Sequence, residues 1–154
     1  MSIDQRLAEL GITLPQPAAP VAAYVPAVEL GGLLHISGQI SFAEDGSLIK
    51  GRLGEDVDLD GGIAAARRCG IMLVAQMKAA LGSLDRVERI VKLGVFVNSD
   101  PAFTDQPKVA NGASELMAEV LGAAGKHARS AVGVAALPLG AAVEVDAIIA
   151  LAPH

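Results

Sequence analysis

Residues 125–138 read GKHARSAVGVAALP. Arg129 stands at the head of a run of small and apolar side chains, and residues 130–142 carry no charge. Such a run is typical of a buried strand, yet a guanidinium is always charged and is costly to bury without a partner. Arg129 therefore lies either at a solvated strand end or in a cleft where it meets an anionic group.

A second apolar strand is expected at residues 142–151, AVEVDAIIAL. Side chains alternate between the faces of a strand, so Arg129 shares a face with Ala131, while Glu144 and Asp146 interrupt an otherwise apolar strand. If the charges of both strands border one cleft, Arg129 can bind a carboxylate and Glu144 can hold a water molecule or a proton. The pattern alone favours another interpretation, in which Arg129 pairs with an acid and fixes a subunit interface.

The rest of the chain supplies further strands and the helices that cover them. Periodicity and turn residues predict three more strands and two helices. The strands span residues 23–30, 33–38 and 87–99, and the helices span 60–81 and 107–121. Pro26 places the first strand at an edge or a bulge, and the alternation from Val87 to Val97 gives the third strand one mostly apolar face. By default, the last two strands of the chain are expected to form a hairpin.

These elements predict the fold class and the assembly. Two helices can cover only one face of such a sheet, so the sequence predicts an α+β fold, a mixed β-sheet with two helices packed on one face. The last strand is apolar on both faces from Ala147 to Leu151. A second subunit is the economical cover for the other face, and we expect a closed homo-oligomer. We expect residues 1–154 to form a single domain, in which residues 1–20 are an N-terminal helix and a proline-rich extension.

Composition and charge argue against several classes of protein. The net charge is −5 and no run of Lys or Arg occurs, which argues against nucleic-acid binding through phosphates. A long uncharged stretch, residues 11–28, holds four prolines, which rule out a membrane helix there. The first ten residues already carry charges where a secretory signal would be apolar. A single cysteine excludes an internal disulfide and fits the reducing cytoplasm.

The motifs predict no metal site. The acids of EDVDLDGG, residues 55–62, match the first positions of a calcium loop, but the twelfth position is Arg67, so helix capping is the better interpretation. The three histidines, of which His154 is the last residue, lack the spacing of a zinc site. Cys69 lies on the apolar stripe of helix 60–81 and is expected to be a buried hydrophobe.

Several short motifs together resemble one known family. LLHISGQI (33–40), VKLGVFVNSD (91–100) and HARSAVGVAALP (127–138), followed by VEVDAI (143–148), are similar to the RidA (YjgF-like) family of reactive-intermediate deaminases. The resemblance implies a fold like that of chorismate mutase and a homotrimer with clefts between its subunits. It also implies hydrolysis of 2-imino acids, or of their enamines, to 2-keto acids and ammonia without a cofactor.

The same resemblance implies roles for individual residues. The arginine that clamps the substrate carboxylate corresponds to Arg129, and the glutamate that positions water corresponds to Glu144. The substrate-binding positions correspond to Tyr24, Ser37, Gly38, Gln39, Asn111 and Ala131. Ala131 stands where the archetype often carries a cysteine, and the N-terminal segment and two long loops depart from it, so the chain represents a divergent branch.

Three other functions stay open at this point. The same arginine would serve a non-catalytic trimer that senses small keto or amino acids. The family's older label, an endoribonuclease or translation inhibitor, fits less well with the acidic balance of charge. The third possibility is a protein with a purely structural role in interactions.

The pairing of the last two strands decides whether Arg129 and Glu144 can meet. If these strands form a hairpin, Arg129 lies near residue 150, and it meets Glu144 only across an interface or not at all.

Overall fold

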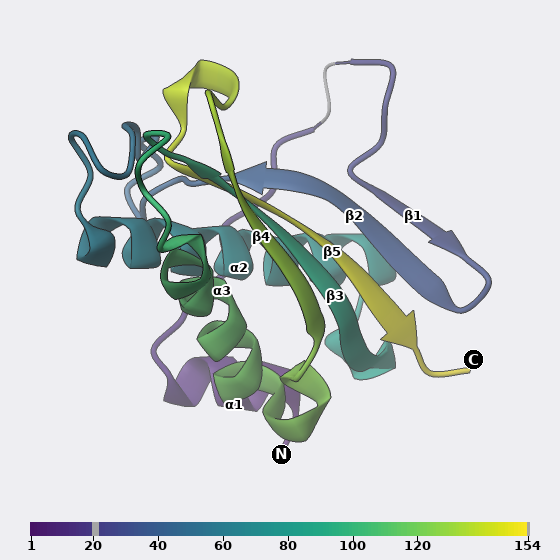
Figure 1. Cartoon of the computed structure of the whole chain (residues 1–154). Helices are drawn as coiled ribbons and strands as arrows, with labels where there is room; N and C mark the ends of the chain where they lie inside the picture. The colour runs from purple at the N-terminus through teal and green to yellow at the C-terminus, as the bar shows by residue number, and fades with distance from the viewer. Residues whose placement is uncertain (20–21, 154) are drawn as a thin grey trace.

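The computed structural model describes residues 1–19 and 22–153, so Pro20 and His154 lie outside the described residues. It confirms the predicted α+β class and the presence of every predicted helix and strand (Figure 1). In chain order the elements are α1 (Ile3–Glu9), β1 (Ala27–Leu30), β2 (Leu33–Ile40), α2 (Leu59–Leu81), β3 (Val87–Asn98), α3 (Gln106–Leu121), β4 (Ala128–Val134) and β5 (Val143–Leu151). Short 3-10 turns at Leu84–Arg86, Gly122–Gly125 and Pro138–Gly140 connect some of them.

The five strands form one mixed sheet in the order β1-β2-β5-β3-β4. β4 pairs with β3 in parallel, and every other neighbouring pair is antiparallel. The position of β1 at the edge confirms the prediction from Pro26. The predicted hairpin between the last two strands is wrong, because β3 lies between β4 and β5. A parallel pair needs a long crossover, which α3 provides between β3 and β4, and the apolar β5 then takes the centre of the sheet.

The helix boundaries follow from capping residues. Ser2 caps α1 in a capping box with Gln5, and Asp58 caps α2 by accepting a hydrogen bond from the Gly61 amide at 2.7 Å. Gly82 ends α2 with a φ of 74°, a conformation that glycine adopts without strain. The capping role that the sequence suggested for the acids of residues 55–62 is thus confirmed at Asp58. None of the helices within the described ranges has the length and apolarity needed to span a membrane.

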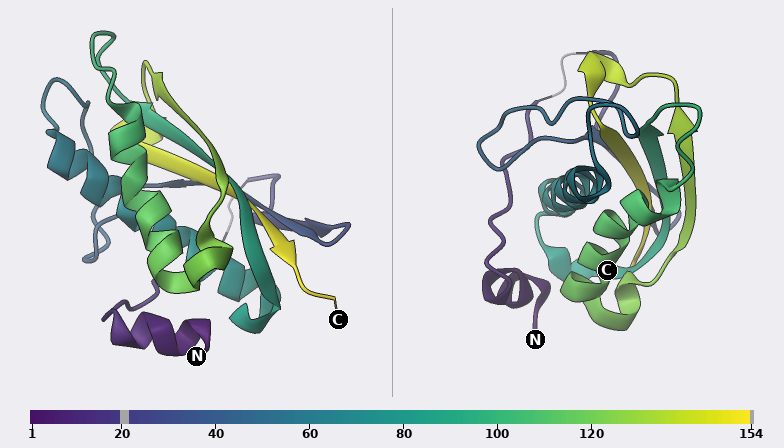
Figure 2. Two further views of the ribbon diagram at one scale, coloured as in Figure 1. Left: turned by 60° about the horizontal axis from the view of Figure 1, so that its bottom comes forward. Right: turned by 60° about the vertical axis from the view of Figure 1, so that its left-hand side comes forward.

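The core lies between the sheet and the two long helices. Figure 2 shows α2 and α3 together on one side of the sheet, as predicted. α2 packs on β2 and β5, and α3 packs on β3 and β4. The largest fully buried side chains include Leu73 and Met77 of α2, Leu116 of α3, Leu93 of β3 and Ile149 of β5.

The predicted apolar face of β3 is confirmed only in its second half. The register of β3 against β5 shifts between Val87 and Arg89 and again between Ile90 and Lys92. As a result Ile90 is buried and Val91 is 37% exposed, the reverse of the strict alternation expected from the sequence. Such bulges bend a strand and change the direction in which its side chains point.

The second face of the sheet is covered by none of the described elements. Val28 and Leu30 of β1 and Val132 of β4 are 50%, 75% and 46% exposed on it. Glu144 and Asp146 of β5 belong to the same face, since their neighbours Val143 and Val145 are fully buried against the helices. The uncovered apolar face fits the expected oligomer, whose form stays a prediction.

Candidate functional site

Arg129 points from β4 toward α3, on the helix-covered face of the sheet. Its Nη1 donates to Asn111 Oδ1 at 2.9 Å and to Ser114 Oγ at 3.0 Å, and its Nη2 donates to the Pro107 carbonyl at 3.3 Å. No Asp or Glu among the described residues forms an ion pair with it. An ion pair within one chain is therefore absent from the described residues, and the pairing across a subunit interface that the sequence pattern favoured stays a prediction. Neutral groups hold the guanidinium through these three hydrogen bonds.

Two residues that the sequence analysis missed complete this cluster. The His127 ring contacts Ser114 Oγ through Nε2 at 2.8 Å and the Gly125 carbonyl through Nδ1 at 2.6 Å. Ser114 follows Asn111 by three residues, and side chains at that spacing share a helix face. His127 precedes Arg129 by two residues, the spacing of neighbours on one face of a strand. Both spacings are visible in the sequence once Arg129 is placed against α3. A hollow of about 390 Å³ borders Ser114, His127 and Arg129.

Ala131 lies on the same face of β4 as Arg129, two residues farther along. It pairs with Val95 of β3 and is half-buried against the core. Arg129, Asn111 and Ala131, all expected from the sequence to contact substrate, are thus carried by α3 and β4 alone.

A second group of predicted residues lines another pocket, of about 430 Å³. Tyr24, Ser37, Gly38 and Gln39 border it, together with residues of α2 and of the proline-rich extension. Ser37 Oγ donates to the Val25 carbonyl at 3.3 Å. Gln39 is held at both ends of its amide, because its Nε2 donates to the Ser37 carbonyl at 2.9 Å and its Oε1 accepts from Gln76 at 3.2 Å. Tyr24 is 61% exposed, so its ring is available to a ligand or a partner.

Glu144 lies against this second group. The β2–β5 register shifts between Ile36 and Gln39, and the bulge brings Gly38 beneath the Glu144 carboxylate. A Cβ at residue 38 would collide with Glu144 Oε2, so the glycine makes room for the acid. Burial, and secondarily the charge of Asp146, raises the pKa of Glu144. Its carboxyl group is therefore better suited to exchange a proton than a solvated carboxylate is.

One chain does not bring Arg129 and Glu144 together. Arg129 pairs with Leu93, and Leu93 pairs with Ala147, three residues along β5 from Glu144. At about 4.8 Å between strands and about 3.3 Å per residue, the two Cα atoms are roughly 14 Å apart. Their side chains also leave opposite faces of the sheet. The predicted residues thus form two groups, one around Arg129 and one around Glu144.

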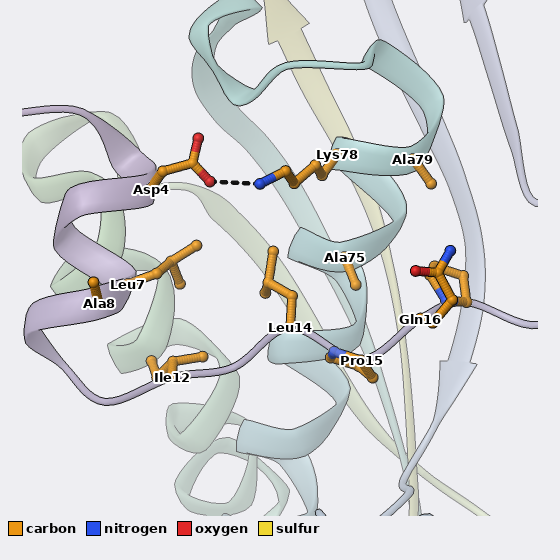
Figure 3. A pocket seen from close by; sticks show the side chains of 11 residues that line it. Asp4, Leu7, Ala8, Ile12, Leu14, Pro15, Gln16, Ala75, Lys78 and Ala79 are labelled. Carbon is orange, nitrogen blue, oxygen red and sulfur yellow. Dashed lines mark hydrogen bonds and ion pairs between the residues drawn. The ribbon is translucent and has the colours of Figure 1, made fainter.

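Two other features do not have the character of a reaction centre. A groove of about 470 Å³ between α1, residues 12–17 and α2 contains no predicted site residue, and its lysine, Lys78, is paired with Asp4 at 2.8 Å (Figure 3). Cys69 is fully buried, with Sγ 3.5 Å from the Val143 carbonyl, and burial raises the pKa of its thiol. Its predicted role as a buried hydrophobe is confirmed.

Among residues 1–19 and 22–153, no three His, Cys, Asp or Glu side chains are grouped to hold a metal ion.

The fold and much of the sequence are similar to those of known proteins. A family model described as "YjgF/chorismate mutase-like, putative endoribonuclease" matches residues 4–150. Protein TCP17 of Trypanosoma cruzi is 56% identical over 150 residues, which cover 97% of this chain and 94% of that protein. The crystal structure of the protein Atu1372 of unknown function from Agrobacterium tumefaciens is 46% identical, with a TM-score of 0.89 over 97% of this chain and 94% of that one. A 2-iminobutanoate/2-iminopropanoate deaminase from Dermatophagoides farinae is 25% identical over 142 residues, 91% of this chain and 94% of that protein. The chain belongs to the YjgF (RidA) family.

Proposed function

We propose that this protein hydrolyses small 2-imino acids to 2-keto acids and ammonia. The observation that carries the proposal is the state of Arg129, whose guanidinium is fixed by three neutral acceptors and has no carboxylate partner in the described chain. A fixed and uncompensated arginine is well suited to bind a substrate carboxylate through paired hydrogen bonds. A relative named as an imine deaminase supports the same reaction class.

The reaction needs little from the protein beyond placement and proton transfer. The carbon of a protonated imine is already electrophilic, so a positioned water can attack it directly. Glu144 would accept a proton from that water as the C–O bond forms. The nitrogen of the resulting carbinolamine is then protonated, the C–N bond breaks, and ammonia leaves while the hydroxyl proton passes to solvent as the keto group forms. The raised pKa of Glu144 favours its acting as both acceptor and donor in these steps.

We place the site between two copies of the chain, in a homotrimer. One copy would supply Arg129, Asn111 and Ala131, and its neighbour would supply Glu144, Tyr24 and the Ser37–Gln39 segment. The separation of the two groups within one chain supports this division. The exposed apolar residues on the uncovered face of the sheet also support an assembly.

The test uses 2-iminobutanoate released in situ by a threonine dehydratase, with semicarbazide to trap the surviving imine. We expect the wild type to lower the trapped product. Loss of two charge-assisted hydrogen bonds in Arg129→Ala should reduce kcat/KM at least about a hundred-fold. Arg89→Ala is the matched control, because Arg89 is exposed and its guanidinium donates to the Lys126 carbonyl. Equal activity of wild type and Arg129→Ala would contradict the proposal.

Mixing two inactive variants tests whether the site is shared. If Arg129 and Glu144 of different copies form each site, subunits of Arg129→Ala and Glu144→Gln that are unfolded and refolded together should recover about one quarter of the wild-type activity, by random assembly. If one copy supplies both residues, the mixture stays inactive.

The other functions predict different results. A sensor would bind 2-oxobutanoate without any change in the rate of imine loss. An endoribonuclease, the activity in the family's description, would cleave RNA in a manner that survives both repurification and Arg129→Ala.

A further inference from the structure

The geometry points to Ser114 and His127 as positioning residues for the carboxylate-binding face of Arg129. The inference rests on the proposed binding of a substrate carboxylate by Arg129, and it adds two residues that act through the arginine. The chain of contacts runs from the Gly125 carbonyl through His127 and Ser114 to Arg129.

The direction of each hydrogen bond in this chain follows from its fixed end. The Gly125 carbonyl can only accept, so Nδ1 of His127 must be the donor in their 2.6 Å contact. In the neutral imidazole Nε2 is then an acceptor, and the Ser114 hydroxyl donates to it at 2.8 Å. With its proton directed to His127, the Ser114 oxygen presents a lone pair to Arg129 Nη1 at 3.0 Å. His127 thus sets the orientation of the hydroxyl that holds the arginine.

These contacts decide which side of the guanidinium is free. Nη1 has two hydrogens, and Ser114 Oγ and Asn111 Oδ1 account for both. Nη2 uses one hydrogen on the Pro107 carbonyl. Nε has no acceptor among the described residues, and the second Nη2 hydrogen is also free. The two free hydrogens, one on Nε and one on Nη2, therefore remain for a carboxylate, which binds paired donors through both oxygens.

Without Ser114 the arginine would lose one of the two groups that hold Nη1. Its side chain would then sample other rotamers, and a ligand would have to order it on binding. Such a change weakens ligand binding and leaves the chemical step nearly unaltered, because both residues act through the arginine. This combination separates a positioning role from a catalytic one.

The experiment measures the Kd for 2-oxobutanoate by titration calorimetry, and kcat and KM for the imine made in situ. We expect Ser114→Ala to raise Kd and KM about ten-fold, with kcat within about two-fold of the wild type. Ser114→Thr keeps the hydroxyl and should bind within about two-fold of the wild type. His127→Phe keeps a ring but loses both nitrogens, and we expect it to raise Kd and KM about three-fold. Ser47→Ala, at an exposed turn where Ser47 bonds Asp45, is the control for loss of a serine hydroxyl.

A spectroscopic measurement tests the chain of contacts without any variant. Long-range ¹H–¹⁵N spectra of histidine rings distinguish the two neutral tautomers, and we expect His127 to carry its proton on Nδ1. A proton on Nε2, unchanged binding by Ser114→Ala and His127→Phe, or binding by Ser114→Thr as weak as that of Ser114→Ala would each overturn the inference.

Failure of the proposed function gives a different result. If the wild type binds 2-oxobutanoate but leaves the imine intact, the hydrolysis proposal falls, and the Kd values of the variants still decide the role of Ser114. If the wild type does not bind 2-oxobutanoate at all, Arg129 has no carboxylate to hold and the inference falls with it.

Discussion

Gly112→Ala replaces one hydrogen by a methyl group, and we expect this small change to destabilise the protein strongly. Gly112 lies where α3 crosses α2, and a Cβ there would collide with the Ile63 carbonyl oxygen and come within 3.1 Å of the Arg67 amide nitrogen. Both are backbone atoms of α2, so no side chain can rotate away. The two helices must therefore move apart to accommodate the methyl group.

The size of the effect follows from two opposing contributions. Overpacking of a well-packed interior costs about 1–3 kcal/mol, and backbone contacts place this site at about 3 kcal/mol. In the opposite direction, alanine in place of glycine inside a helix stabilises the folded protein by about 1 kcal/mol through its higher helix propensity. A net loss of about 2 kcal/mol remains, which for a chain of this length lowers Tm by roughly 4–8 °C. The shift of α3 would also displace Asn111 and Ser114, and we expect weaker carboxylate binding in the same variant.

Gly70→Ala is the matched control for this prediction. Gly70 lies on α2 at the same helix–helix contact, but the atom nearest to an added Cβ is the Leu116 Cδ2 methyl at 2.7 Å, the end of a flexible side chain. The gain in helix propensity and the displacement of Leu116 should nearly cancel, to within about 1 kcal/mol. Urea unfolding at one fixed protein concentration measures both variants. The reasoning fails if Gly112→Ala is as stable as the wild type, or if Gly70→Ala loses as much.

Two further predictions concern titratable groups. Because burial raises the pKa of Glu144 above its ordinary value of 4.5, the native state holds that proton more tightly than the unfolded state, and this contribution to stability is lost as the pH rises through the raised pKa. Glu144→Gln should therefore gain stability relative to the wild type between pH 4 and pH 7 in urea unfolding, and a relative loss over that range would contradict the cause assigned. Cys69 is fully buried with a raised thiol pKa, so it should react with a thiol reagent such as DTNB only when the protein unfolds. Rapid labelling of the native protein would refute that burial.

The local signals in the sequence were enough to predict the helices and the edge of the sheet. Ser2, Asp58 and Gly82 act where capping rules place them, and Pro26 keeps β1 short and at the edge. These predictions succeed because capping and proline effects depend on only a few neighbouring residues. The bulges of β3 escaped prediction because Val87, Val91, Leu93, Val95 and Val97 keep a two-residue spacing that only Arg89 interrupts, and the pairing with β5 is what shifts the register.

The order of the strands could not be read from their order in the chain. Two consecutive strands joined by a short segment suggest a hairpin, and the turn at Pro138–Gly140 is short enough to make one. The parallel pairing of β4 with β3 instead depends on how α3 packs across the sheet, which is a property of the whole core. β5 then inserts between β2 and β3, because it is the strand with apolar residues on both faces.

The strand order determines how the predicted site residues can work together. In a β4–β5 hairpin, Arg129 would lie next to β5, whereas the observed sheet places β3 between them and turns Arg129 toward α3. The Arg129 guanidinium donates hydrogen bonds to Asn111 and Ser114 of α3. The Glu144 carboxylate lies over Gly38, in the bulge of β2. Each residue is ordered by contacts within one chain, yet neither can reach the other across the sheet. The proposed hydrolysis, which needs both a carboxylate clamp and a proton acceptor, therefore requires a second copy. On that proposal assembly and catalysis are linked, and a substitution that breaks the proposed trimer should abolish imine hydrolysis while leaving Arg129 and its three acceptors in place.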